Sequence, residues 1–195
     1  MGVILPSWTW TWTWMQAALF TTLLLTGCGP SPSDAARPVS AVPSPGTLPA
    51  HHSNFLQPLT NAQPRLTTVK LWLGSIELET EVAARPIEIL TGMMYREKME
   101  DTEGMIFVLP DAPRKASFWM RNTKVPLSCA YIDAAGRILE THNLNPFDES
   151  PVESSTDQIS YVLEVPQGWF QRKKIEVGAF VRTDRGTLQE TFRRR

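Results

Sequence analysis

Cysteine is scarce in this chain, whose 195 residues include only Cys28 and Cys129. The two lie far apart in the sequence and form no zinc-binding pattern, so we expect neither a metal nor a cofactor. If Cys28 is modified, as argued below, Cys129 has no partner for a disulfide within the chain. The folded part would then depend on its hydrophobic core alone.

An excess of charge of either sign is also missing. Nineteen Lys and Arg residues face twenty Asp and Glu residues, which leaves a net charge of −1 and a pI near 6.3. A general nucleic-acid binder normally carries a strongly basic surface. The composition therefore argues against nucleic acid as a partner.

The chain has no hydrophobic run long enough to span a bilayer, which takes ~20 residues. Residues 15–25 (MQAALFTTLLL) form a shorter apolar run, typical of the central part of a signal peptide. Leu25-Thr26-Gly27-Cys28 follows and resembles a bacterial lipobox, in which the cysteine is acylated and becomes the new N-terminus. We predict a lipoprotein signal peptide over 1–27 and lipidation of Cys28, although no Lys or Arg precedes Arg37.

Two acyl chains would anchor the protein stably to a membrane. We therefore expect a lipid-anchored protein of the cell envelope on the periplasmic side. Gly29, in place of Asp after Cys28, resembles sorting to the outer membrane. The alternative is an uncleaved membrane anchor with a free Cys28.

Proline concentrates in the next segment, where eight of the sixteen prolines fall between Pro30 and Pro64. Large apolar residues are few there, so the segment has little capacity to form a core. We interpret residues 28–65 as a Pro-rich tether. The pair His51 and His52 lies within it, and we interpret these side chains as solvated rather than as metal ligands.

Regular patterning begins at residue 66 and predicts one folded domain over 66–195. Residues 67–73 and 76–82 alternate apolar and polar side chains around Gly74-Ser75, which predicts a β-hairpin. Its acidic face, Glu77, Glu79 and Glu81, is expected to be solvated. Residues 88–99 carry an apolar stripe typical of a helix.

Most of the remaining domain has the pattern of strands and turns. The expected strands are 105–109, 116–121, 127–133, 137–142, 159–165, 180–183 and 188–192, with one helical turn over 169–174. The last two strands are predicted to form a hairpin, and residues 143–157 form a long loop. The fold class is therefore α+β and mainly β, a compact antiparallel barrel or sandwich-like domain with one principal helix.

Several short motifs resemble, in order, those of one bacterial and archaeal family, domain of unknown function 192 (DUF192). They are GMMYR at 92–96, GMIF at 104–107, FWMRNT at 118–123, PL at 126–127, GRI at 136–138, YVLE at 161–164 and VG at 177–178. The resemblance implies a compact β-rich fold with one helix, and many members look exported or lipid-anchored. It implies no activity. Ser128 stands where the family usually has Asp, so an acid–base scheme centred on that carboxylate would be lost here.

The stretch 117–127 (SFWMRNTKVPL) sets large apolar groups beside guanidinium, amide and hydroxyl groups. Such a mixture is typical of a surface that binds a sugar or a peptide. We predict a ligand-binding surface formed by Arg96, Trp119, Asn122 and Thr123 together with the 143–157 loop. The alternatives are that Arg96 is a structural cation and that Asn122 and Thr123 serve a turn.

No specific catalytic arrangement is present. Cys129 with His142 is a conceivable nucleophile–base pair, but a cysteine in the middle of an apolar strand is more typical of a core. We therefore expect a non-enzymatic binding or accessory module for a small molecule, glycan or peptide. Two alternatives stay open: a hydrolase that uses His142 with carboxylates of 148–153, and a purely structural envelope protein.

Overall fold

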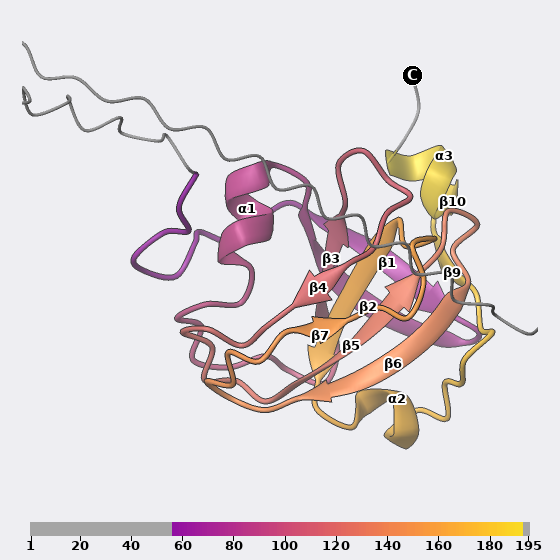
Figure 1. Cartoon of the computed structure of the whole chain (residues 1–195). Coiled ribbons are helices and arrows are strands. Elements are labelled where there is room, and N and C mark those ends of the chain that lie inside the picture. The colour runs from indigo at the N-terminus through magenta and orange to yellow at the C-terminus, as the bar shows by residue number, and fades with distance from the viewer. Residues whose placement is uncertain (1–55, 193–195) are drawn as a thin grey trace, which may run out of the picture. The chain divides into compact units, whose positions relative to one another are not determined.

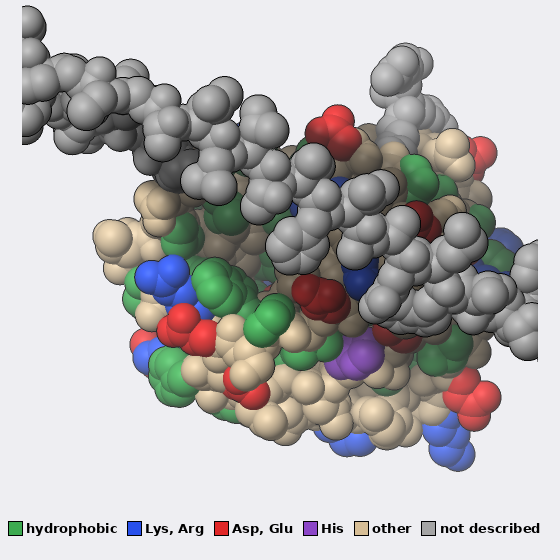
Figure 2. Space-filling model, in the orientation of Figure 1, with side chains coloured by type: hydrophobic (Ala, Val, Ile, Leu, Met, Phe, Trp, Pro, Cys, Tyr) green, Lys and Arg blue, Asp and Glu red, His purple; other side chains and the backbone are tan. Residues whose placement is uncertain are grey.

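The structure is a computed structural model that describes residues 56–192. The predicted signal peptide, Cys28, His51 and His52 lie outside the described residues, as does most of the predicted tether. In residues 56–192, no helix is both long enough and apolar enough to cross a membrane. Acidic and basic side chains are interspersed on the face shown in Figure 2.

One curled, eight-stranded sheet forms the body of the domain (Figure 1). Its strands, in spatial order, are β10 (Gly186–Thr187), β9 (Val181–Thr183), β1 (Thr68–Leu73), β2 (Ile76–Ala83), β3 (Glu103–Val108), β8 (Tyr161–Pro166), β5 (Leu127–Ile132) and β6 (Ile138–Leu144). A separate ladder pairs β4 (Ser117–Phe118) with β7 (Val152–Glu153). The helices are α1 (Pro86–Thr91), α2 (Trp169–Arg172) and α3 (Leu188–Phe192). The mainly β fold class is confirmed, as a half-barrel with three short helices.

The predicted first hairpin is present as β1 and β2, joined at Gly74 and paired antiparallel. The next pairing differs from the antiparallel expectation, because β2 and β3 run parallel. A parallel neighbour requires a crossover connection, and α1 lies within that connection. The sheet is therefore antiparallel except at this one pair, which positions α1 beside β3.

In the central strands β3, β8 and β5 both faces are buried, and each face packs against its own apolar core. On β8, Tyr161, Leu163 and Val165 belong to the core that α2 and α3 cover. Val162 belongs to the opposite core, which α1 and Phe118 cover. Burial on both faces explains why the central strands have nearly continuous apolar sequences rather than strict alternation.

Helix α1 is shorter than the helix predicted over 88–99, which is a correction. It ends after Thr91, because Gly92 has φ +47°, a conformation that side chains rarely adopt. A Cβ on Gly92 would lie 3.3 Å from the Phe107 ring. The motif at 92–96 therefore forms turns, and it buries Met93 and Met94 against the sheet.

The predicted final hairpin is also wrong in its second half. Residues 188–192 form helix α3 instead of a strand. The backbone N–H of Thr187 donates to Glu190 Oε2 (2.8 Å), and the Glu190 N–H donates to Thr187 Oγ1 (3.1 Å). This reciprocal pair is a capping box, which starts a helix.

The last residues of the predicted tether, 56–65, contact the domain, and we call them the strap. The backbone N–H of Leu59 donates to Thr91 Oγ1 (3.0 Å). Gln63 is buried, and its Nε2 donates to the backbone oxygens of Glu88 (3.2 Å) and Gly92 (2.9 Å). The strap is thus fastened to the end of α1.

Candidate functional site

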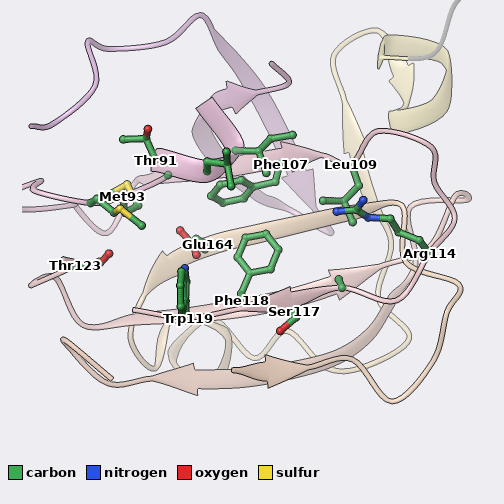
Figure 3. Close-up of a pocket in the computed structure, with 15 residues that line it drawn as sticks. Thr91, Met93, Phe107, Leu109, Arg114, Ser117, Phe118, Trp119, Thr123 and Glu164 are labelled. Carbon is green, nitrogen blue, oxygen red and sulfur yellow. The ribbon is translucent and has the colours of Figure 1, made fainter. Parts of the chain in front are cut away.

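A cavity of about 170 Å³ lies between α1, β3, β8 and the segment around β4. We call it the Glu164 cavity (Figure 3). The lining residues are mainly apolar and come from separate parts of the sequence. They are residues 89–94, Phe107, Leu109, Arg114, residues 116–119, Thr123 and Glu164.

Glu164 lies in the middle of the central strand β8, with Met105 of β3 and Cys129 of β5 as its neighbours in register. Its side chain is on the face that packs against the apolar core beneath α1, and 4% of its surface is exposed. No basic group or hydrogen-bond donor among residues 56–192 pairs with its carboxyl. Burial therefore raises the pKa of Glu164 to about 8, because the charged form is poorly solvated there.

Aromatic rings form one wall of the cavity. Phe107 and Phe118 meet edge to face, with ring centroids 4.9 Å apart. Trp119 follows Phe118 and has 44% of its surface exposed, while the Arg121 guanidinium lies 5.7 Å from its ring centroid. Figure 3 shows the Glu164 carboxyl between Met93 and Trp119 in that view. An acidic group and an exposed aromatic ring thus line the same cavity.

Two of the four residues predicted to bind ligand line this cavity, namely Trp119 and Thr123. Thr123 is buried, and its hydroxyl donates to the Arg121 backbone oxygen (3.1 Å). The predicted strand over 116–121 is reduced to β4, so Trp119 lies just beyond the strand. The main chain turns there and leaves the indole at the cavity mouth.

Asn122 lies elsewhere, in a hollow of about 260 Å³ with Tyr95 and Phe147. Its Nδ2 donates to the Tyr95 hydroxyl (2.8 Å), and its backbone oxygen accepts from the Tyr95 N–H (2.8 Å). All three residues have positive φ values. Of the predicted 143–157 loop, Phe147 reaches this second hollow.

Arg96 lines a third hollow, and its Nη2 donates to Glu81 Oε2 (2.9 Å). Glu81 is buried at 7% exposure and also accepts from the Leu66 N–H (2.7 Å). The prediction that Glu81 is solvated is therefore wrong, because its carboxylate ties the chain before β1 to the segment after α1. The expectation that Arg96, Trp119 and Asn122 share one hollow is also wrong.

His142 and Cys129 are partners in the β5–β6 register. The imidazole Nε2 lies 3.0 Å from Glu140 Oε2, and His142 lines none of the three hollows described above. Cys129 is fully buried, and burial holds the pKa of its thiol far above the usual range. A reactive thiol needs the opposite environment, so the geometry matches a core cysteine.

Ser128 has a structural role at the position where the resemblance implies Asp. Its hydroxyl donates to Asn143 Oδ1 (2.6 Å) and accepts from the Gly168 N–H (2.9 Å). It thereby joins β5 to β6 and to the start of α2. Among residues 56–192, no group of three or more His, Cys, Asp and Glu side chains could hold a metal ion.

Comparison with known proteins identifies the family. The model of DUF192, described as "Uncharacterized ACR, COG1430", matches residues 69–183. The chain belongs to the DUF192 family. No curated protein matches it.

Two solved structures resemble the DUF192 domain. One is a protein of unknown function from Novosphingobium aromaticivorans, with 33% identity and a TM-score of 0.56, and the match covers 60% of this chain and 85% of that one. The other, from Sinorhizobium meliloti, is described as a "putative transcription regulator". It has 29% identity and a TM-score of 0.57, and the match covers 63% of this chain and 98% of that one.

The sequence-based prediction did not include Glu164, which the structure makes the most unusual polar group of the DUF192 domain. A signal is present in the sequence, since Glu164 is the only charged residue in the apolar run 159–165 (ISYVLEV). A strand of a sheet buried on both faces is almost entirely apolar. A lone carboxyl within it therefore indicates a buried acid.

Proposed function

We propose that the DUF192 domain binds a small ligand and that the ligand occupies the Glu164 cavity. The observation that carries the proposal is the buried Glu164 carboxyl, which has no partner among the described residues and faces a cavity. Burying a polar group without a partner is costly. A ligand that supplies the missing partner would recover that cost, which is how a few polar groups fix a ligand in an apolar site.

The rim of the cavity supports the same proposal. Leu90 on α1 and Trp119 after β4 have 41% and 44% of their surfaces exposed. Large exposed apolar side chains beside a hollow favour an amphipathic ligand, because burying their surface under the ligand is favourable in free energy. No Ser or Thr hydroxyl of the lining hydrogen-bonds to a His, Asp or Glu side chain among residues 56–192, so the lining contains no paired nucleophile and base, which favours binding over hydrolysis.

We also propose that this module is held at the bacterial cell envelope by a lipid on Cys28. The support is the apolar run 15–25 and the lipobox-like residues that follow it. A tether rich in proline would then hold the DUF192 domain away from the membrane surface.

The binding proposal is tested by protein-detected NMR with a panel of small amines, alcohols, carboxylates and cell-wall fragments. Binding in the cavity is expected to shift the Trp119 indole signal and the backbone signals of residues 89–94. Trp119→Ala should weaken binding, whereas the matched control Trp72→Ala, on β1 and outside the cavity, should not. The proposal fails if no compound shifts these signals or if the two variants bind alike.

A further inference from the structure

We infer that the ligand of the Glu164 cavity carries a positively charged ammonium group, which pairs with the Glu164 carboxylate beside the Trp119 ring. This inference rests on the proposed binding function and names the chemistry of its ligand. The geometry that supports it is a single buried acidic group that lines a cavity and that no basic group of residues 56–192 pairs with.

The groups around Glu164 leave the negative charge unbalanced. Helix α1 contributes apolar side chains and the Thr91 hydroxyl to the lining, and β3 contributes Phe107. From β5, Cys129 and Tyr131 face the same core, and burial holds the pKa of both groups far above the usual range, so both stay protonated and neutral. These neighbours offer the carboxylate no compensating positive charge.

Arg114 is the one positively charged residue among those that line the cavity. Figure 3 shows its guanidinium and Glu164 on opposite sides of the Phe118 ring, with Trp119 on the Glu164 side. A positive ligand group is therefore favoured at the Trp119 side, away from Arg114. An aromatic face attracts an ammonium group, most strongly where water is excluded.

Binding of an ammonium group changes the protonation of Glu164. In the free domain at pH 7 the carboxyl is mostly neutral, since its pKa is about 8. An ammonium ion stabilises the carboxylate, so the O–H bond breaks, the proton passes to the buffer, and an ion pair forms. With a quaternary ammonium ligand, which has no titratable proton, roughly 0.9 proton should be released per ligand bound at pH 7, given the pKa of about 8.

The test is titration calorimetry of the full chain, using benzyltrimethylammonium as the probe, in two buffers that differ in ionisation enthalpy. Benzyl alcohol and phenylacetate serve as neutral and anionic comparisons. The ammonium probe should bind best and release protons. Glu164→Gln should weaken its binding at least roughly tenfold and abolish proton release, while Glu79→Gln, an exposed strand residue, should change neither.

A second measurement does not depend on any variant. In the wild-type domain, affinity for the ammonium probe should fall as the pH is lowered from 8 to 6, by up to about tenfold per pH unit. The inference is overturned if benzyl alcohol or phenylacetate binds in the cavity and the ammonium probe does not, an outcome that leaves the proposed binding function intact. If none of the three probes and no compound of the wider panel shifts the cavity signals in NMR, both proposals fail together.

Discussion

At the scale of single residues, Trp119 and Arg96 show what a local sequence pattern can and cannot predict. Trp119 was predicted as part of a binding surface because it stands beside polar groups, and it lines the Glu164 cavity. Arg96 was grouped with it on the same grounds, yet it pairs with buried Glu81. The partner of a long, flexible cation depends on contacts between distant segments, which a local pattern does not contain.

Glu164 should make the stability of the domain depend on pH. Below pH 4.5 its carboxyl is neutral in both the folded and unfolded chain. As the pH rises from 4.5 to 8, the unfolded chain loses this proton while the folded chain keeps it, so the free energy of unfolding falls. Each unit of pKa difference corresponds to about 1.4 kcal/mol, so Glu164→Gln should gain stability relative to wild type over this range.

Urea unfolding at a series of pH values measures this effect. The control is Glu79→Gln, which removes an exposed carboxyl on β2 and should keep the wild-type pH dependence. If the free energy of unfolding changes equally with pH in wild type and in Glu164→Gln between pH 4.5 and 8, the Glu164 carboxyl is well solvated in the folded domain.

Gly92 gives a second prediction at this scale. Both Gly92→Ala and Gly74→Ala place a side chain at a positive φ, but only the Cβ at residue 92 would contact another group, the Phe107 ring at 3.3 Å. Strained backbone conformations cost about 1–3 kcal/mol, so both variants should lose stability and Gly92→Ala should lose more. Thermal unfolding compares the stability of the two variants. An equal loss of stability would mean that the Phe107 ring moves aside without a measurable cost in free energy.

At the scale of elements, alternation predicted the β1–β2 hairpin well, because one face of each strand packs on the core and Gly74 turns the chain. It failed where local chemistry outweighs periodicity. The apolar stripe of 88–99 predicted a longer helix, although the positive φ of Gly92 ends α1. The capping box of Thr187 and Glu190 starts α3 in a segment whose composition suits a strand.

The capping box of α3 is open to a direct test. Thr187→Ala removes the hydroxyl that accepts from the Glu190 N–H, and loss of such a cap costs about 1 kcal/mol. Hydrogen exchange should then quicken in 188–192, where Leu188 is part of the core on that face of the sheet. Gln189→Ala, an exposed change on the same helix, is the control and should leave exchange unchanged. Unchanged exchange in Thr187→Ala would mean that packing alone holds α3.

At the scale of the whole molecule, composition and motif order predicted the mainly β class and the family, because both depend on many residues at once. Neither the parallel β2–β3 pair nor the position of the cavity was predicted from the sequence. The parallel pair depends on the crossover through α1, whereas the cavity lies between α1, β3, β8 and the segment around β4, which are distant in the sequence. The pairing of distant elements is set by the packing of both sheet faces rather than by any one motif.

The proposed membrane attachment is also tested at the scale of the whole molecule. In a bacterium that processes lipoproteins, Cys28→Ser should move the protein from the membrane fraction to the soluble fraction. Mass spectrometry should show that the acyl chains are lost. The matched control is Cys129→Ala, which alters the buried cysteine of β5 and should leave the fractionation unchanged. Wild-type protein without acyl chains on Cys28 in the mass spectrum would refute lipidation at this residue.

The strap connects the surface of the domain to the wall of the Glu164 cavity. Leu59 and Gln63 hold Thr91 and Gly92, two residues of the cavity wall. A dye attached at exposed Asn61 would therefore sense movement of that wall. A sensor of cavity occupancy could be built on this contact without altering any residue of the proposed binding site.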